Sequence, residues 1–171
     1  PPGIAAKSTS IGIGQRLLAE IDGIHFGPAA LTWQALIPEL CSVQEAIQLP
    51  DGQLLTMSCL SFFISELGTC IDFSDRKMID VLVDLWDGRD GLWAKSTATR
   101  GREGVEGPWI NFIACTTPSW LADNLPKNAI MGGFSSRCVW LFANEKKCLI
   151  PYPKLMLDTA KTDTWNALVE D

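Results

Sequence analysis

Apolar residues fall into short runs that predict buried strands, and helical spacing predicts helices between them. The clearest expected strand is Leu54–Ser65, whose second half is a largely apolar run typical of a strand buried on both faces of a parallel sheet. Trp109–Cys115 and Cys138–Phe142 are apolar runs of the same kind, and Ile21–Phe26 is a shorter one. We therefore expect strands over these four stretches.

The expected helices cover Ser10–Glu20, Leu31–Ala46, Phe73–Gly88, Pro118–Asn124 and Lys154–Val169. The clearest of them has Ser74 as its expected N-cap and ends at Gly88. Pro50-Asp51-Gly52 predicts a turn, and residues 88–108, rich in glycine and charge, predict a loop or β-hairpin insertion. Helices that alternate with buried strands predict a three-layer α/β fold, in which a mostly parallel sheet carries helices on both faces.

Chain length, net charge and cysteine content narrow the class of protein. A chain of 171 residues fits one domain, and a net charge of −6 argues against a protein whose whole surface clamps nucleic acid. Six cysteines lie in apolar surroundings without a C-x-x-C pair, as is typical of reduced core residues in a cytosolic protein. No apolar run approaches the roughly 20 residues of a membrane span, so we expect no membrane partner. The start at Pro1 without methionine, and the stop inside an expected helix, predict a fragment truncated at both ends.

A lysine followed by two hydroxyl residues, Lys7, Ser8 and Thr9, lies where a loop runs into an expected helix. In a phosphate-binding loop the backbone N–H groups and the helix dipole hold the phosphates, the lysine reaches the β and γ oxygens, and the hydroxyl coordinates Mg²⁺. Pro1 and Ala6 stand where the motif G-x-x-x-x-G-K-[ST] has glycines. The three residues are therefore a partial match to that motif.

Glu66 follows the clearest expected strand at its carboxyl end. Ligands of open α/β sheets bind outside the carboxyl ends of the strands, so this acid is placed to orient a water or a metal ion. The alternative is a carboxylate that caps the next turn. Thr116-Thr117-Pro118 repeats the layout after Trp109–Cys115, with polar groups again at a carboxyl end.

Basic residues gather in two further places. Lys95, Arg100 and Arg102 lie in the 88–108 insertion and are candidates for contact with nucleic acid or another partner; the alternative is an ordinary solvated loop, because acidic residues lie among them. Arg137 stands at the entrance to the expected strand Cys138–Phe142, where a merely solubilising arginine is not expected. Its alternative is an ion pair with a nearby acid such as Glu145.

The order of these motifs resembles the P-loop ATPases of the RecA/AAA+ kind. More narrowly, it is similar to the ATPase domain of phage and prophage primase–helicase or replicative-helicase proteins. The resemblance matches Thr32–Leu36 after the expected strand Ile21–Phe26, Ile64–Gly68 as a Walker B motif, and Leu85–Gly88 before the expected insertion at residues 88–108. It covers almost the whole chain. It implies a P-loop NTPase-like fold in a bacterial host cytoplasm.

The resemblance also implies roles and partners. ATP phosphates and Mg²⁺ would be bound by Gly3, Lys7, Ser8 and Thr9, with Ser65 beside the metal; Glu66 would orient the attacking water, Thr117 would sense the γ-phosphate and Arg137 would be an arginine finger. The partners would be DNA, in its single-stranded form, and further copies of the chain in a homo-oligomer.

Two departures from the family pattern keep alternatives open. Ser65 replaces the acid that usually precedes the Walker B glutamate, and a serine supplies no charge to the metal ion. One alternative is a degenerate nucleotide-binding or structural module without hydrolysis. Another is a DNA-packaging ATPase of the terminase kind, which carries a separate nuclease with an acidic cluster that this sequence does not show.

Overall fold

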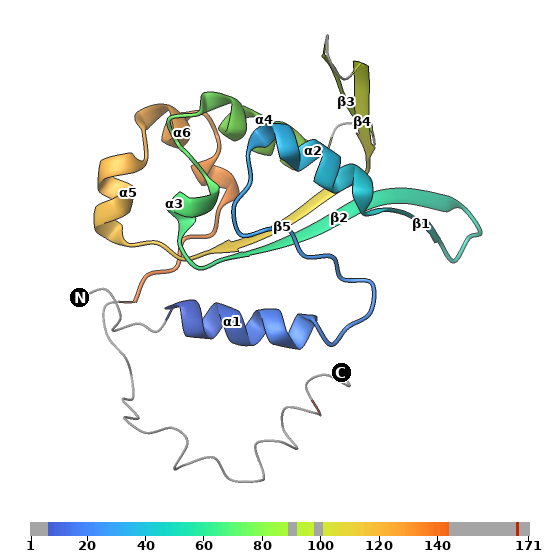
Figure 1. The fold of residues 1–171 in the computed structure, drawn as a ribbon, viewed down its shortest axis with the longest axis horizontal. Coiled ribbons are helices and arrows are strands. Elements are labelled where there is room, and N and C mark those ends of the chain that lie inside the picture. Colours follow the sequence, from blue (N-terminus) through green and yellow to red (C-terminus); the bar gives the residue numbers. More distant parts are fainter. Residues whose placement is uncertain (1–6, 89–91, 98–100, 144–166, 168–171) are drawn as a thin grey trace. The chain divides into compact units, whose positions relative to one another are not determined.

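The computed structural model describes residues 7–88, 92–97, 101–143 and 167 (Figure 1). The chain forms two compact units. The first unit takes residues 1–24 and 141–171 and contributes helix α1 (Lys7–Leu18). The second unit takes residues 25–140 and contains both sheets. The helix expected over Lys154–Val169 lies outside the described residues except for Ala167.

Two separate sheets make up the strand structure of the described residues. The larger has the order β1-β2-β5, with β1 (Gln44–Gln48) antiparallel to β2 (Leu54–Ile64) and β5 (Pro108–Ala114) parallel to β2. The smaller is an antiparallel hairpin of β3 (Leu92–Thr97) and β4 (Gly101–Glu106). The expected three-layer fold with a mostly parallel, P-loop-like sheet is therefore wrong, because the described strands form one mixed sheet and one antiparallel pair.

The turn before β2 explains why the sheet is mixed. Gly52 has φ 85°, a conformation that favours glycine, and the N–H of Leu49 donates to the carbonyl of Gln53 at 2.8 Å. This tight turn folds the chain back, so the residues before it pair with β2 as an antiparallel strand. The helix expected over Leu31–Ala46 is correspondingly shorter: α2 covers Trp33–Ser42.

The other edge of β2 pairs in parallel, as expected, but its partner β5 is mostly exposed and not the buried strand that the sequence predicted. The residues of β2 pair in parallel with β5 from Ser58 opposite Pro108 to Ile64 opposite Ala114.

The strand expected over Ile21–Phe26 is reduced to one parallel bridge between Phe26 and Ser61. A short apolar run with one bridge is too little to count as a strand, and this part of the prediction is also wrong.

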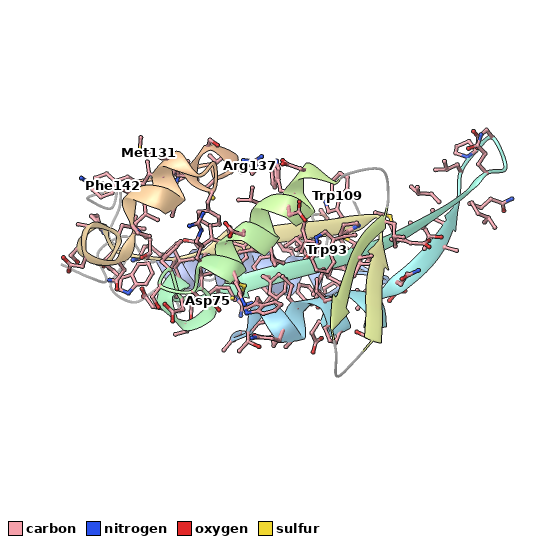
Figure 2. The ribbon with its side chains drawn as sticks, turned by 90° about the horizontal axis from the view of Figure 1, so that it is seen from above. Asp75, Trp93, Trp109, Met131, Arg137 and Phe142 are labelled. Carbon is pink, nitrogen blue, oxygen red and sulfur yellow. The ribbon has the colours of Figure 1, made fainter. Side chains whose placement is uncertain are left out.

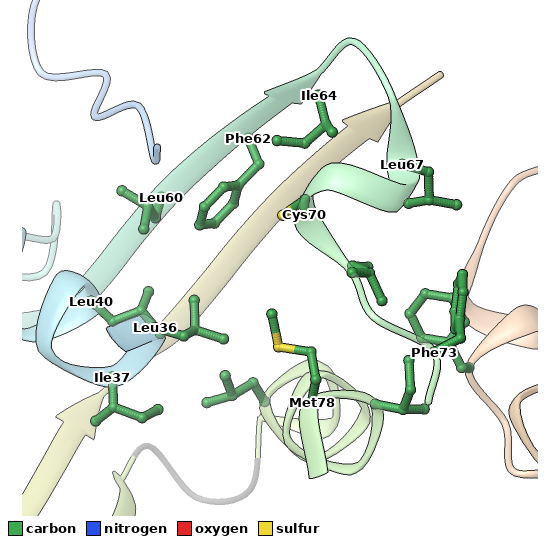
Figure 3. Close-up of a cluster of buried hydrophobic side chains, with 14 of the residues drawn as sticks. Leu36, Ile37, Leu40, Leu60, Phe62, Ile64, Leu67, Cys70, Phe73 and Met78 are labelled. Atoms are coloured by element: carbon green, nitrogen blue, oxygen red, sulfur yellow. The ribbon is translucent and has the colours of Figure 1, made fainter. Parts of the chain in front are cut away.

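The core of the second unit lies on one face of β2. Leu60, Phe62 and Ile64 alternate along the strand, and each side chain is at most 2% exposed. They pack against apolar residues of α2 and of α4 (Arg76–Asp87), as Figure 3 shows; the buried residues from these helices are Leu36, Ile37, Leu40, Met78, Ile79 and Leu85. Burial of this apolar surface is the main stabilisation available to the unit.

Helix α4 is close to its predicted position, but its start differs. Asp75 is the N-cap and accepts a hydrogen bond from the N–H of Lys77 at 3.0 Å, so Ser74 is not the cap. Ser74 instead donates its N–H and its hydroxyl to Asp72. Gly88 ends the helix in the left-handed conformation, as expected.

Short helices fill the rest of the second unit: α3 (Leu67–Cys70), α5 (Pro118–Asn124), α6 (Lys127–Met131) and the 3-10 helix η1 (Ser135–Arg137). The strand expected over Cys138–Phe142 is wrong, because these residues have no regular structure. Val139 is 88% exposed, and the indole of Trp140 donates to the carbonyl of Ser135. Across the described ranges, no helix has the length and apolar character needed to cross a membrane.

Candidate functional site

The carboxyl ends of β2 and β5 lie side by side and carry the polar residues that the sequence singled out. The N–H of Cys115 donates to the carbonyl of Ile64 at 2.9 Å, and the N–H of Leu67 donates to the carbonyl of Cys115 at 2.7 Å. These bonds continue the parallel ladder past the last strand residues. Glu66 and Thr116 therefore leave neighbouring strands at the same edge of the sheet, as ligand-binding residues of parallel strands do.

Glu66 occupies the N-cap position of α3 without using its side chain there. Its backbone is extended, with φ −143° and ψ 117°, and its carboxylate makes no capping hydrogen bond. The backbone carbonyl of Glu66 is the hydrogen-bond acceptor instead. It accepts from the N–H of Thr69 at 3.0 Å and from the hydroxyl of Thr69 at 2.8 Å. The capping alternative is therefore not realised, and the half-buried carboxylate remains available for chemistry.

Thr117 has a structural task. Its hydroxyl oxygen accepts a hydrogen bond from the N–H of Trp120 at 3.2 Å, which makes it the N-cap of α5, and it lies 3.2 Å from the hydroxyl of Ser119. Pro118 follows at the first helical position, a favoured place for proline. Threonine followed by proline before a short helix is a sequence pattern that could have predicted this cap. The expected role as a γ-phosphate sensor stays a prediction.

Aromatic packing fixes the two turns that follow β2 and β5. A Cβ atom added to Gly68 would lie 2.7 Å from the indole of Trp120, so α3 and α5 approach too closely for any other residue at that position. The ring of Phe73 lies 5.7 Å from Trp120 and 5.6 Å from Phe134 between centroids. This cluster packs together the helices that follow Glu66 and Thr117.

The residues expected to bind phosphate lie in the other unit. Helix α1 is described from Lys7, so Lys7, Ser8 and Thr9, which were expected in the loop before Ser10, lie within the helix, with Lys7 half-buried and Ser8 and Thr9 exposed. Gly3 lies outside the described residues. A lysine and two hydroxyls in the first turn of a helix provide donors beside the positive end of its dipole.

Metal ligation at the sheet edge would depend on Ser65, which is exposed where the chain leaves β2. Within the described parts of the chain, no three His, Cys, Asp or Glu residues gather as a metal site would need. A hydroxyl binds Mg²⁺ weakly by itself, because hard divalent cations favour carboxylates, waters and phosphates. The described residues around Ser65 thus offer Glu66 as the neighbouring charged oxygen ligand.

Arg137, labelled in Figure 2, forms an ion pair with Asp87, an acid that the sequence analysis did not consider as its partner. Its guanidinium contacts the carboxylate of Asp87, with Nη2 2.5 Å and Nε 3.1 Å from the same oxygen, and its Nη1 donates to the carbonyl of Gly133 at 2.9 Å. Asp87 is the last residue of α4, where a carboxylate interacts unfavourably with the negative end of the helix dipole. The positive charge of Arg137 offsets this unfavourable interaction. The partner considered from the sequence, Glu145, lies outside the described residues. The arginine-finger role stays a prediction.

The basic insertion contains the β3–β4 hairpin. Lys95 pairs in register with Glu103, and Arg102 pairs with Ser96; the side chains of Lys95 and Arg102, and all of Arg100, lie outside what the structure describes. The indole of Trp93 donates to the carboxylate of Asp84 on α4 at 2.7 Å and anchors the hairpin base. The sequence pattern does not indicate this contact between α4 and β3.

A small open cavity lies at the same hairpin base. Its volume is about 220 Å³, and it is lined by Asp84, Gly88, Leu92, Trp93, Ala94 and Pro108. Ligand pockets for drug-sized molecules are usually about 300–1,000 Å³. The cavity is therefore too small to enclose a nucleotide.

The described cysteines are thiols that take no part in a disulfide. They are Cys41, Cys59, Cys70, Cys115 and Cys138, and Cys148 lies outside the described residues. Burial raises the pKa of the Cys70 and Cys138 thiols, and burial together with the charge of Glu45 raises the pKa of Cys59. These three thiols stay protonated at neutral pH, which makes them poor nucleophiles.

Comparisons with protein-family models, with curated proteins and with solved structures gave no match.

Proposed function

We propose that this chain binds ATP with Mg²⁺ and hydrolyses it, using Glu66 to polarise the attacking water. The observation that carries the proposal is the carboxylate of Glu66, which stands at the carboxyl end of a parallel strand pair and is not used to cap the helix that follows. The strand before it, β2, is largely buried from Ser58 to Ile64, and aromatic side chains pack around the turn after it. A general base needs both a fixed position and a free acceptor, and this residue has both.

Helix α1 supports the nucleotide-binding half of the proposal. Its described residues place Lys7 and the exposed hydroxyls of Ser8 and Thr9 within one helical turn, the kind of donors that bind phosphate oxygens. The ammonium of Lys7 would neutralise the β and γ oxygens, as the lysine of a phosphate-binding loop does. The order of Lys7-Ser8-Thr9, Ile64–Gly68 and Thr116-Thr117-Pro118 in the sequence resembles that of ATPases and supports the same assignment.

Binding is tested by titrating a fluorescent ATP analogue into the chain with and without Mg²⁺. We expect Lys7→Ala to weaken binding at least about tenfold, because the only cation in this first helical turn is lost. The matched control is Lys127→Ala, which removes an exposed lysine from α6. Equal affinity of the Lys7 variant and the parent would remove the phosphate-binding assignment.

Hydrolysis is tested separately with Glu66→Gln, which keeps the shape of the side chain but cannot accept a proton. We expect unchanged ATP affinity and a turnover reduced by about 10²–10⁴, the usual contribution of a general base. Glu20→Gln, at an exposed position after α1, is the matched control. If the Glu66 variant hydrolyses ATP at the parent rate, Glu66 is structural.

Ser65 favours a second candidate, a nucleotide-binding module without hydrolysis. The residue before Glu66 is an uncharged, exposed hydroxyl, so it adds no negative charge to hold Mg²⁺. ATP binding without measurable turnover would support this candidate. Recovery of turnover in Ser65→Asp would then show that the missing charge is the cause.

DNA is the substrate we propose for the work driven by hydrolysis, with the β3–β4 hairpin as the contact. Lys95 and Arg102 lie on its two strands, and Arg100 lies between them in the sequence. Fluorescence anisotropy with a single-stranded oligonucleotide tests this. Replacing the three residues by alanine should weaken binding and flatten its salt dependence, because each phosphate contact releases a counterion. Binding equal to that of the parent at every salt concentration would exclude the hairpin.

A further inference from the structure

The outer edge of β5 presents backbone groups without a described partner. Cys115 directs its N–H and its carbonyl toward β2, and successive residues of a strand alternate in direction, so Ile110, Phe112 and Ala114 direct theirs to the opposite edge. The sheet order β1-β2-β5 leaves β5 at the margin, and no described residue pairs with this edge. An open ladder of this kind is a template for another strand.

The side chains of β5 are also unlike those of a protected edge strand. Trp109 is 59% exposed, Phe112 is 39% exposed and Ile113 is 44% exposed. The strand has no charged residue, and its one proline, Pro108, stands at its first position. Soluble proteins usually protect such edges with lysine, proline or a bulge. This edge has the composition of a strand that is paired on both sides.

We propose that β5 pairs with β5 of a second copy of this chain, antiparallel and centred on Asn111, to form a continuous sheet through a two-fold axis. In this register Ile110 lies opposite the partner's Phe112, and their outward N–H and carbonyl groups form the hydrogen-bonded pairs of an antiparallel ladder. Trp109 lies opposite the partner's Ile113 in a non-hydrogen-bonded pair, where side chains approach most closely. Asn111 lies opposite its own copy.

The side chains of β5 complement those of a second, antiparallel copy of β5. A two-fold interface requires that each residue complement the one that faces it. Here an aromatic residue faces a β-branched one on both faces of the sheet, which is a favourable cross-strand pair, and no like charges oppose each other. The amide of Asn111 is held by the hydroxyl of Ser61 at 3.3 Å and by the indole of Trp109 at 3.1 Å, so its orientation at the axis is fixed.

The position of Asn111 on the axis gives a sharp test by sedimentation analysis over a dilution series. One strand pair is a small interface, and we expect a dissociation constant in the micromolar range, about 1–100 µM. Asn111→Lys and Asn111→Asp each place two like charges opposite each other and should weaken dimerisation at least about tenfold. An equimolar mixture of the two variants should recover heterodimers, because the charges are then complementary.

Two controls separate charge at the axis from other effects. Asn111→Ser removes the amide without adding charge and should dimerise as the parent does, within about threefold. Gln48→Lys adds the same charge to an exposed position on β1 and should also leave the dimer intact. A parent chain that stays monomeric at all concentrations, or a variant mixture that does not associate, overturns the proposal.

Amide hydrogen exchange provides a measurement that needs no variant. In the dimer the amides of Ile110, Phe112 and Ala114 are hydrogen-bonded across the axis, so their exchange should slow as the protein concentration rises through the dissociation constant. The amides of β1 serve as the internal reference, since that strand is exposed along its whole length. Exchange rates in β5 that do not change with concentration contradict the proposed pairing.

Discussion

The two halves of β2 are both extended, but the first half is largely exposed to solvent and the second half is largely buried. The half from Leu54 to Met57 pairs with β1 in a ribbon whose β1 residues are all exposed, whereas the half from Ser58 to Ile64 pairs with β5 under α2 and α4. Leu54 is 72% exposed and Leu60 is 1% exposed, although both are leucines in one strand. Residue type therefore does not decide burial here; the helices that pack on the parallel half do.

The difference also separates two sources of stability. The ribbon is closed by a local turn and needs no contact far along the sequence. The parallel half depends on helices and on a strand that lie far from it in the chain. Glu66 extends from the parallel half, so the candidate chemistry is placed on the part of the sheet that packing makes rigid.

The largest expected effect comes from emptying the core beneath the parallel half. Phe62→Ala should lower the free energy of unfolding by about 3–5 kcal/mol, because the ring is 2% exposed and its removal leaves a cavity. Leu54→Ala in the exposed half should change it by less than about 0.5 kcal/mol. Urea denaturation of the two variants measures the contrast, and equal losses would show that the ribbon is part of the core.

Overpacking the same half should have the next largest effect. A Cβ atom at Gly27 would overlap the ring of Phe62, so Gly27→Ala should cost about 1–3 kcal/mol of unfolding free energy. Combining it with Phe62→Leu should recover part of that loss, since the smaller side chain makes room. Thermal denaturation of the single and double variants checks this, and strictly additive effects would contradict the close approach.

A smaller effect is expected at the turn of the exposed half. Gly52 has φ 85°, and an alanine there should cost about 1 kcal/mol because its Cβ atom disfavours that conformation. The matched control is Gly12→Ala in α1, where an added Cβ atom meets no neighbour and helix propensity should rise. If Gly52→Ala is as stable as the parent, the turn tolerates another conformation and the glycine is not required there.

The smallest effect concerns the polar turn between α3 and α4. The hydroxyl and the N–H of Ser74 donate to Asp72 and hold the pKa of this carboxyl below its ordinary value near 3.8. A lowered native pKa adds stability above the ordinary value, and that stability is lost as the pH falls through the native pKa. Asp72→Asn and Ser74→Ala should both flatten the acid limb of unfolding free energy against pH. An unchanged limb in both variants would contradict the interaction.

Local sequence rules predicted the elements that depend on neighbouring residues. Gly88 ends α4, Pro50-Asp51-Gly52 forms a turn, and the apolar runs before Glu66 and Thr116 form adjacent parallel strands. The position of Glu66 at a strand end could be predicted because the change from apolar to charged residues is abrupt. Its freedom from capping could not, since that depends on the backbone of the next turn.

Tertiary contacts decided the predictions that were wrong. The pattern of Leu31–Ala46 is helical throughout, but the turn after it draws the last residues into β1. Cys138–Phe142 has the composition of a strand and lacks a pairing partner among the described residues. The mixed sheet follows from the first of these facts, because one edge of β2 is taken by a hairpin. The ion pair of Arg137 with Asp87 joins residues 50 positions apart, a separation that no local pattern reveals.

The register of β2 has a consequence for how the chain folds during synthesis. The ribbon needs only the turn at Gly52 and can form within microseconds, whereas the parallel pairing joins residues 50 positions apart. A ribosome adding about 5–20 residues each second takes several seconds to cover that interval. Throughout that delay the apolar edge of β2 has no strand partner on the nascent chain, so we expect this stretch to be the part that chaperones bind during synthesis.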